Sequence, residues 1–160
     1  MWSVIACAMW SWTGPPESVA TVAQGGIFDL EYVFVPINVG GNHWVLVVVD
    51  LRAQRLAYYD SMRSDSWDDP TQQRLTNVFR WLFLERERHH QDATEYFATW
   101  QPHVWVASGM PQQRNAFDCG VFMCQTANYI AQNGQLNFSQ QNMPAFRLRM
   151  ACEIGRARLF

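Results

Sequence analysis

The residue best suited to chemistry is a cysteine, Cys119, in the stretch Phe117-Asp118-Cys119-Gly120 at the head of an apolar helical pattern. A cysteine in the first turn of a helix lies at the positive end of the helix dipole and beside unpaired backbone N–H groups, which favour thiolate over thiol. The thiolate is the nucleophilic form, and Gly120 leaves no side chain beside it to block a substrate backbone. The alternative is that Cys119 packs in the core, because free cysteine is among the most buried residue types.

An imidazole and a carboxylate that could serve this thiol come from a predicted β-hairpin. The strands at 43–50 and 55–60 are joined by a turn, and a turn centred between Leu51 and Arg52 places His43 directly opposite Asp60. Directly opposed side chains share a face, with Cβ atoms about 4.5–5.5 Å apart, which lets a carboxylate reach an imidazole. A register shift of two residues makes the pair diagonal but keeps it at the same end of the sheet.

Taken alone, the hairpin pattern fits equally well a histidine and a turn aspartate that have no catalytic role. Combined with the helix-terminal Cys119, a Cys/His/Asp arrangement for nucleophilic catalysis is the better interpretation. Acyl transfer also requires hydrogen-bond donors for the oxyanion. Gln113 lies in a loop six residues before Cys119, so its side-chain amide is expected to fold back beside the Cys119 backbone N–H.

The elements that must position these residues can be predicted from periodicity and turn signals. The strand at 43–50 is apolar on both alternating faces, which is typical of a central strand buried on both sides. The other predicted elements are strands at 33–37, 55–60 and 103–107, a loop at 89–99, and helices that begin at Asp69-Pro70, at Asp118 and at Pro144, the second of them ending at Gly134. Strands followed by helices packed on them predict an α+β domain with a mixed sheet.

Length and composition restrict the class of protein. The chain has 160 residues, 49% of them apolar, which predicts one domain over residues 1–160. The net charge of −2, with no lysine, argues against a nucleic-acid partner, and no apolar run reaches the roughly 20 residues of a membrane-spanning helix. Four cysteines without a C-x-x-C pair disfavour a disulfide scaffold and a zinc site, and they indicate reduced thiols inside a cell.

Four motifs in order resemble a known family. His43-Trp44 is followed 17 residues later by Asp60, and Gln113-x5-Cys119 lies inside a Pro-Gln-Gln-x-Asn-x-x-Asp-Cys-Gly stretch. With the segments VFVPINVGGNHWVLVVVDL, LAYYDSM, MPQQRNAFDCGVFMC and LNFSQQNMPAFRLRMACEI, the chain from residue 27 to 160 resembles the ubiquitin-like-specific protease family of cysteine proteases. The sentrin (SUMO)-specific branch is the most similar, and the resemblance implies a papain-like core.

The resemblance implies a role for each matched residue. Cys119 is expected to be the nucleophile, His43 the general base and acid, Asp60 the residue that orients His43, and Gln113 an oxyanion donor. Trp44 matches the family's tryptophan that helps to enclose the Gly-Gly tail of the modifier, although a core aromatic on a buried strand would also explain it. The implied reaction is removal of a SUMO-like modifier from lysine-linked conjugates, or processing of its precursor, without metal or cofactor, in the nucleus or cytoplasm.

One part of the family pattern is not found. Family members begin their catalytic domain with a segment of Trp-Leu-Asn-Asp type, which the surroundings of Trp2, Trp10 and Trp12 do not reproduce. We therefore expect the chain to lack that N-terminal segment and part of the modifier-docking surface. Two alternatives stay open: a SUMO-binding module with weak or no turnover, and a protease for another ubiquitin-like modifier. The sequence does not indicate an oligomeric state.

Overall fold

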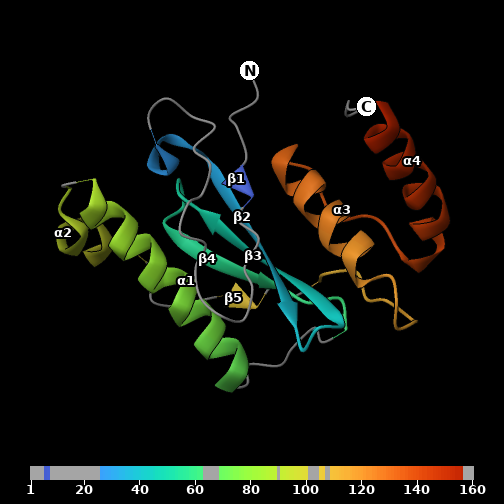
Figure 1. The fold of residues 1–160 in the computed structure, drawn as a ribbon, viewed down its shortest axis with the longest axis horizontal. Coiled ribbons are helices and arrows are strands. Elements are labelled where there is room, and N and C mark those ends of the chain that lie inside the picture. Colours follow the sequence, from blue (N-terminus) through green and yellow to red (C-terminus); the bar gives the residue numbers. More distant parts are fainter. Residues whose placement is uncertain are drawn as a thin grey trace.

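The structure is a computed structural model that describes residues 6–7, 26–62, 69–89, 91–100, 105–106 and 109–156. Its strands and helices follow one another along the chain (Figure 1). They are β1 (Ala6–Cys7), the 3-10 helix η1 (Ile27–Asp29), β2 (Tyr32–Val39), β3 (His43–Asp50), β4 (Arg55–Tyr59), α1 (Asp69–Arg88), α2 (Ala93–Ala98), β5 (Trp105–Val106), α3 (Cys119–Ala131), the 3-10 helix η2 (Gln140–Asn142) and α4 (Met143–Arg156). Trp2, Trp10 and Trp12 lie outside the described residues.

The five strands form one sheet in the order β1-β2-β3-β4-β5. The three central strands are antiparallel, whereas β1 and β5 each run parallel to their neighbour. The predicted mixed sheet is therefore confirmed, and β3 is its central strand. Of the strand predicted at 103–107, Trp105 and Val106 pair with β4, and the other three residues lie outside the described part of the chain.

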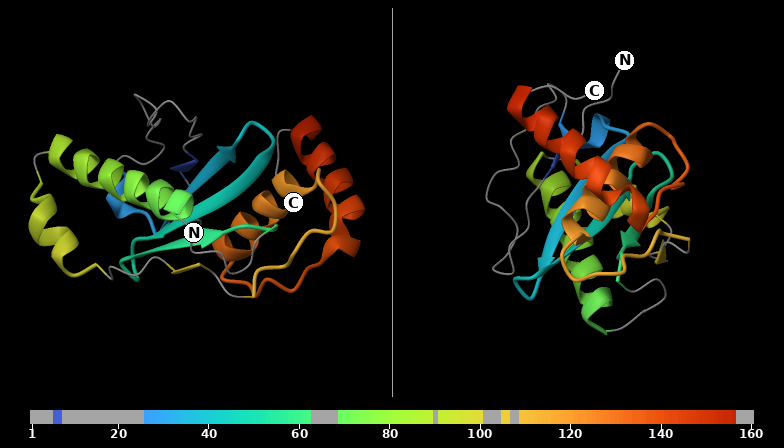
Figure 2. Two further views of the ribbon diagram at one scale, coloured as in Figure 1. Left: turned by 90° about the horizontal axis from the view of Figure 1, so that it is seen from below. Right: turned by 90° about the vertical axis from the view of Figure 1, so that its right-hand side faces the viewer.

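Helices cover both faces of the sheet (Figures 1 and 2). On one face, Val45, Val47 and Val49 of β3 pack with apolar residues of α1 and α2 in the larger core cluster. On the other face, Leu46 and Val48 pack against α3. This alternation explains why β3 is apolar at every position from 44 to 49, and it confirms the α+β class. Among the described residues, no helix is both long enough and apolar enough to cross a membrane.

The register of the β3–β4 hairpin differs from the prediction by two residues. Leu46 pairs with Tyr59 and Asp50 pairs with Arg55, so continuing the ladder places Asp60 opposite Val45 rather than opposite His43. The cause is the connection, which is four residues long and is closed by a hydrogen bond of 2.9 Å from the Ala53 N–H to Asp50 Oδ1. His43 and Asp60 are therefore diagonal neighbours, and they still share a face because side chains alternate with a period of two.

The predicted loop at 89–99 was wrong in part, because residues Ala93–Ala98 form helix α2. Asp92 caps this helix by accepting a hydrogen bond of 2.9 Å from the Glu95 backbone N–H. The aromatic ring of Phe97 packs against that of Trp100, with centroids 4.9 Å apart. The spacing of Asp92 and Glu95 is a helix-start signal, and the prediction gave it too little weight against the polar composition of the segment.

The two C-terminal helices begin close to where the sequence predicts. Helix α3 has Asp118 as its N-terminal flanking residue, and after Ala131 the chain reverses at Asn133, which has a φ of 53°. Helix α4 begins at Met143, so that Pro144 lies in its first turn, where the missing N–H costs nothing. Met143 is buried in a small apolar cluster with Phe122 of α3, which joins α4 to α3.

Candidate active site

His43 and Asp60 are brought together at one end of the sheet. His43 is the first residue of β3, Asp60 follows the last residue of β4, and His43 Nε2 lies 2.8 Å from Asp60 Oδ1. The same oxygen accepts a hydrogen bond of 2.8 Å from the Met62 N–H, and Gln112 Nε2 donates to the Asp60 carbonyl at 3.1 Å. Asp60 is buried, with its carboxylate held by the Met62 N–H and its backbone held by Gln112, so that it can keep the imidazole in one orientation.

The imidazole of His43 interacts with both the carboxylate and the thiol. Its hydrogen bond with Asp60 is the largest cause that raises the pKa of His43 above its ordinary value, partial burial opposes this, and the thiol of Cys119 raises the pKa further. The other ring nitrogen, Nδ1, is buried and has no hydrogen-bond partner among the described residues. This nitrogen is therefore the one left to exchange a proton with a reacting group.

Cys119 is the first residue of α3 and is only 5% exposed. Burial acts to raise the pKa of its thiol, but backbone hydrogen bonds from Trp44 and Gly120 and the imidazole of His43 more than offset that effect. The pKa of Cys119 is therefore lowered from its ordinary value. A lowered thiol pKa and a neighbouring imidazole are the two conditions under which a cysteine can act as a nucleophile.

Trp44 and Gly120 meet beside this thiol. A Cβ atom added at Gly120 would lie 3.7 Å from Cδ1 of the Trp44 side chain, which is ordinary van der Waals contact. Trp44 is partly exposed, although it follows His43 on the central strand β3. Its indole therefore borders the surface next to Cys119 rather than filling the core.

The loop before α3 is tied to the end of β4 through Gln113. The Gln113 N–H donates to the Ser61 carbonyl at 2.8 Å, and Ser61 Oγ donates to Gln113 Oε1 at 2.6 Å. Gln113 Nε2 donates to the Asn115 carbonyl, which uses one of its two N–H groups. The amide end of Gln113 is thus directed toward the turn that leads into Cys119.

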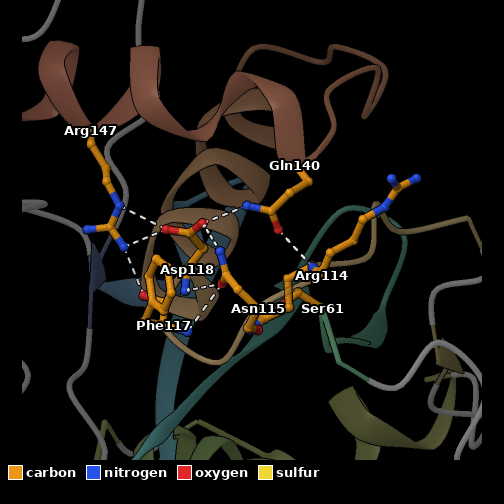
Figure 3. Close-up of polar contacts among 8 residues, drawn as sticks. Ser61, Arg114, Asn115, Phe117, Asp118, Gln140 and Arg147 are labelled. Atoms are coloured by element: carbon orange, nitrogen blue, oxygen red, sulfur yellow. Dashed lines mark hydrogen bonds and ion pairs between the residues drawn. The ribbon is translucent and has the colours of Figure 1, made fainter.

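A second set of polar residues, which sequence reasoning missed, surrounds Asp118 (Figure 3). Asp118 Oδ2 accepts hydrogen bonds from Asn115 Nδ2 at 2.7 Å and from Gln140 Nε2 at 2.6 Å. Asp118 Oδ1 accepts from Arg147 Nε at 2.8 Å and from Nη2 of the same guanidinium at 2.5 Å. Burial acts to raise the pKa of the Asp118 carboxyl, but these donors hold it below its ordinary value.

Some of this network had a signal in the sequence. Asn115 and Asp118 both belong to the Pro-Gln-Gln-x-Asn-x-x-Asp-Cys-Gly stretch, and an Asn that precedes a helix start is a common turn and capping residue. Gln140 and Arg147 have no such signal, because they reach Asp118 only through the packing of α4 on α3.

No metal centre is formed by the described residues, because no three of their His, Cys, Asp or Glu side chains are grouped to hold an ion. The prediction that the protein needs no cofactor stays a prediction. Cys119, Cys124 and Cys152, the cysteines that the structure describes in full, form no disulfide with one another.

Comparison with known proteins identifies the family. The profile of the Ulp1 protease family, C-terminal catalytic domain, matches residues 14–159. The chain belongs to this family. Sentrin-specific protease 2 of Homo sapiens is 33% identical over 143 residues, which cover 89% of this chain and 23% of that protein. Ubiquitin-like-specific protease ESD4 of Arabidopsis thaliana is 34% identical over 133 residues, covering 82% of this chain and 25% of that protein.

This member of the Ulp1 family thus spans about a quarter of the length of the curated relatives that it matches. Among solved structures, the C-terminal Ulp1 protease domain in complex with Smt3, the yeast orthologue of SUMO, has a TM-score of 0.61 at 24% identity, and the match covers 74% of this chain and 49% of that one. The Ulp1-like SUMO protease domain of Chaetomium thermophilum has a TM-score of 0.60 at 23% identity, with 81% and 47% covered. These structures confirm the predicted α+β protease fold.

Proposed function

We propose that this chain is a thiol-dependent peptidase that cleaves after the C-terminal Gly-Gly of a SUMO-like modifier, releasing it from a target lysine or trimming its precursor. The observation that carries the proposal is the 2.8 Å pair of His43 and Asp60 beside the helix-terminal Cys119. The names of the relatives, sentrin-specific and ubiquitin-like-specific proteases, and the Ulp1 complex with Smt3 support the substrate class.

In the proposed mechanism, the Cys119 thiolate attacks the carbonyl carbon of the terminal glycine. The tetrahedral intermediate collapses when His43, as imidazolium, protonates the leaving amine, which leaves a thioester on Cys119. Neutral His43 then takes a proton from a water molecule that attacks the thioester, and the thiol is regenerated with the modifier's free carboxylate. Asp60 keeps the imidazole oriented and stabilises its charged form in both steps.

The developing oxyanion needs donors, and we assign this role to the Cys119 backbone N–H and to Gln113. The Gln113 amide uses one N–H on the Asn115 carbonyl, and its second N–H is the donor that the proposal requires. Removing a single donor of this kind costs about 10²–10³-fold in kcat in proteases that use one.

Selectivity for Gly-Gly follows in this proposal from Trp44 and Gly120. Cδ1 of the Trp44 indole lies 3.7 Å from where a Cβ atom would stand at Gly120, and we expect the indole to narrow the approach to the thiol on that side. Glycine is the residue thin enough to cross such a passage, and bulkier tails are excluded by steric clash.

The remaining parts of the proposal concern the setting of the reaction. The partners are a SUMO-like modifier and its lysine-linked conjugates, with no metal or organic cofactor. We treat residues 1–160 as one catalytic domain, acting inside the cell in the nucleus or cytoplasm. Four cysteines without a C-x-x-C pair are consistent with a reducing compartment.

A modifier that carries an electrophile in place of its C-terminal carboxylate tests the proposal directly. Wild-type protein is expected to form a covalent adduct with SUMO bearing such a warhead, detected as a mass increase on the intact chain. The matched control is Cys119→Ala, which keeps the helix and the His43–Asp60 pair but lacks the nucleophile.

Two results would overturn the proposal: no adduct with wild-type protein, or an adduct that persists in Cys119→Ala. Adducts with ubiquitin or other Gly-Gly-tailed modifiers but none with SUMO would overturn the substrate class while keeping the thiol mechanism. Binding of SUMO without any turnover of a SUMO conjugate would indicate a binding module instead.

A further inference from the structure

The residue directly before the nucleophile carries a buried negative charge. The Asp118 side chain is only 4% exposed and is ionised, because its pKa lies below the ordinary value. A carboxylate on the residue that precedes a thiolate disfavours the thiolate by like-charge repulsion. The sequence therefore places next to Cys119 a charge that opposes the thiolate unless another group neutralises it.

Arg147 of α4 is the group that compensates. Its guanidinium approaches Asp118 Oδ1 with both Nε and Nη2, a two-pronged geometry that fits arginine and not lysine. Nη2 also donates to the Phe117 carbonyl at 2.8 Å, so the same side chain holds the backbone two residues before Cys119. Arg147 lies 29 residues from Asp118 in the sequence and reaches it only because α4 packs on α3.

Neighbouring polar contacts extend this arrangement along the loop (Figure 3). Asn115 Oδ1 accepts hydrogen bonds from the N–H groups of Phe117 and Asp118, at 3.2 and 3.1 Å. Gln140 donates to Asp118, and its oxygen accepts from the Arg114 N–H at 2.8 Å. Every residue from 114 to 118 except Ala116 is thus held by a side chain of the loop itself or of the segment from η2 to α4.

We propose that Arg147 is a positioning residue for the reaction, which neutralises the Asp118 carboxylate and fixes the loop that presents Cys119. The proposal rests on the assignment of Cys119 as the nucleophile. The charged and titratable groups that bear on the thiol are then His43 and Asp60 from the sheet, Asp118 from its own helix start and Arg147 from α4. Of these four, Arg147 comes from α4, an element to which the proposed mechanism assigns no other role.

The test is the pH dependence of iodoacetamide alkylation at Cys119 in the full chain, with the modified site located by fragment mass spectrometry. No modifier is present, so the result does not depend on whether SUMO is the substrate. In Arg147→Gln, the uncompensated carboxylate is expected to move the alkylation midpoint upward by about one pH unit. In Asp118→Asn, the uncompensated guanidinium is expected to move it downward, and the double variant should return close to wild type.

Opposite shifts in the two single variants are a result that a purely structural role would not produce. Unchanged midpoints in folded Arg147→Gln and Asp118→Asn would overturn the proposal, and so would shifts of the same sign. If Arg147→Gln does not fold, the alkylation midpoints of Asp118→Asn and Arg147→Lys still test the proposal. Arg147→Lys keeps the charge and is expected to hold the alkylation midpoint near that of wild type. Its alkylation rate at high pH, where the thiol is fully ionised, is expected to differ from that of wild type because the two-pronged contact is lost.

The matched control is Arg149→Gln on the same helix. Arg149 pairs with Glu153 one turn along α4, at 2.8 Å, whereas the donors described for the Asp118 carboxylate belong to Asn115, Gln140 and Arg147. This variant removes the same charge from the same element, and its alkylation midpoint should equal that of wild type. A midpoint that moves as far as in Arg147→Gln would show that the net charge of α4, and not the contact with Asp118, sets the reactivity.

Discussion

His43 and Asp60 are positioned by the β3–β4 hairpin, whereas Cys119 is positioned by a loop that polar side chains hold. The histidine stands at the start of β3 and the aspartate directly after β4, and the buried apolar residues of these strands pack between α1 and α3. The cysteine begins α3, and the loop before it is fixed by hydrogen bonds to side chains of Asn115, Gln140 and Arg147.

The sheet half of the site, with His43 and Asp60, and the loop half, with Cys119, should therefore respond to different substitutions. Apolar packing behind the sheet is non-directional, so its loss lowers the stability of the whole fold and leaves the local geometry of the pair much as it was. A hydrogen-bonded loop depends on individual charged and polar groups, so loss of one group changes the reactivity of the thiol before it changes global stability.

Removal of the base from the sheet half should have the largest effect. His43→Ala takes away the proton acceptor and donor, and we expect kcat/KM on a SUMO conjugate to fall by about 10⁴-fold or more. The free energy of unfolding should change little, because the imidazole is at the end of β3 rather than in the apolar core. Steady-state kinetics with parallel thermal unfolding checks this, and a loss of less than tenfold would contradict the assigned role.

A cavity behind the sheet should affect stability alone. Leu82 of α1 is fully buried, and Leu82→Ala is expected to lower the free energy of unfolding by about 2–5 kcal/mol. Urea unfolding measures this loss, and the pH midpoint of Cys119 alkylation should stay at its wild-type value below the unfolding transition. A shifted midpoint in the folded variant would show that the core and the thiol are coupled, which breaks the division between the two halves.

Loss of a loop side chain should do the reverse. Asn115→Ala removes the acceptor for the N–H groups of Phe117 and Asp118 and one donor to the Asp118 carboxylate. We expect kcat to fall by about 10- to 100-fold, as for small misplacements of a reacting group, with a loss of stability smaller than in Leu82→Ala. An Asn115→Ala variant with wild-type kcat would show that the loop does not need this support.

How much of the site can be predicted depends on the same distinction. The pairing of His43 with Asp60 survives an error of two residues in the predicted register, because side chains on a strand return to the same face at every second position. Cys119 at the start of α3 follows from an apolar helical pattern and needs no knowledge of the partner elements. Both are local features, so periodicity is sufficient to find them.

Arg147 and Gln140 could not be predicted in this way. Their contacts with Asp118 depend on how α4 packs against α3, and that packing is set by Met143, Phe122 and their neighbours rather than by any residue near the site. Arg147 in isolation has the appearance of one more charge on an exposed helix face. Helix α2 is an intermediate case: Asp92 and Glu95 give it a local start signal, but its aromatic contacts with Phe28 and Trp100 lie outside its own six residues.

The central claim is that the imidazole from the sheet and the thiol from the helix act as one ionic pair. Titration of His43 by NMR, in wild type and in Cys119→Ala, measures this most directly. Because Asp60 and the thiol both raise the pKa of His43, the wild-type imidazole should titrate above the ~6.5 of a free histidine, and its pKa should fall in Cys119→Ala while the contribution of Asp60 remains. Identical His43 titrations in the two proteins would contradict the account.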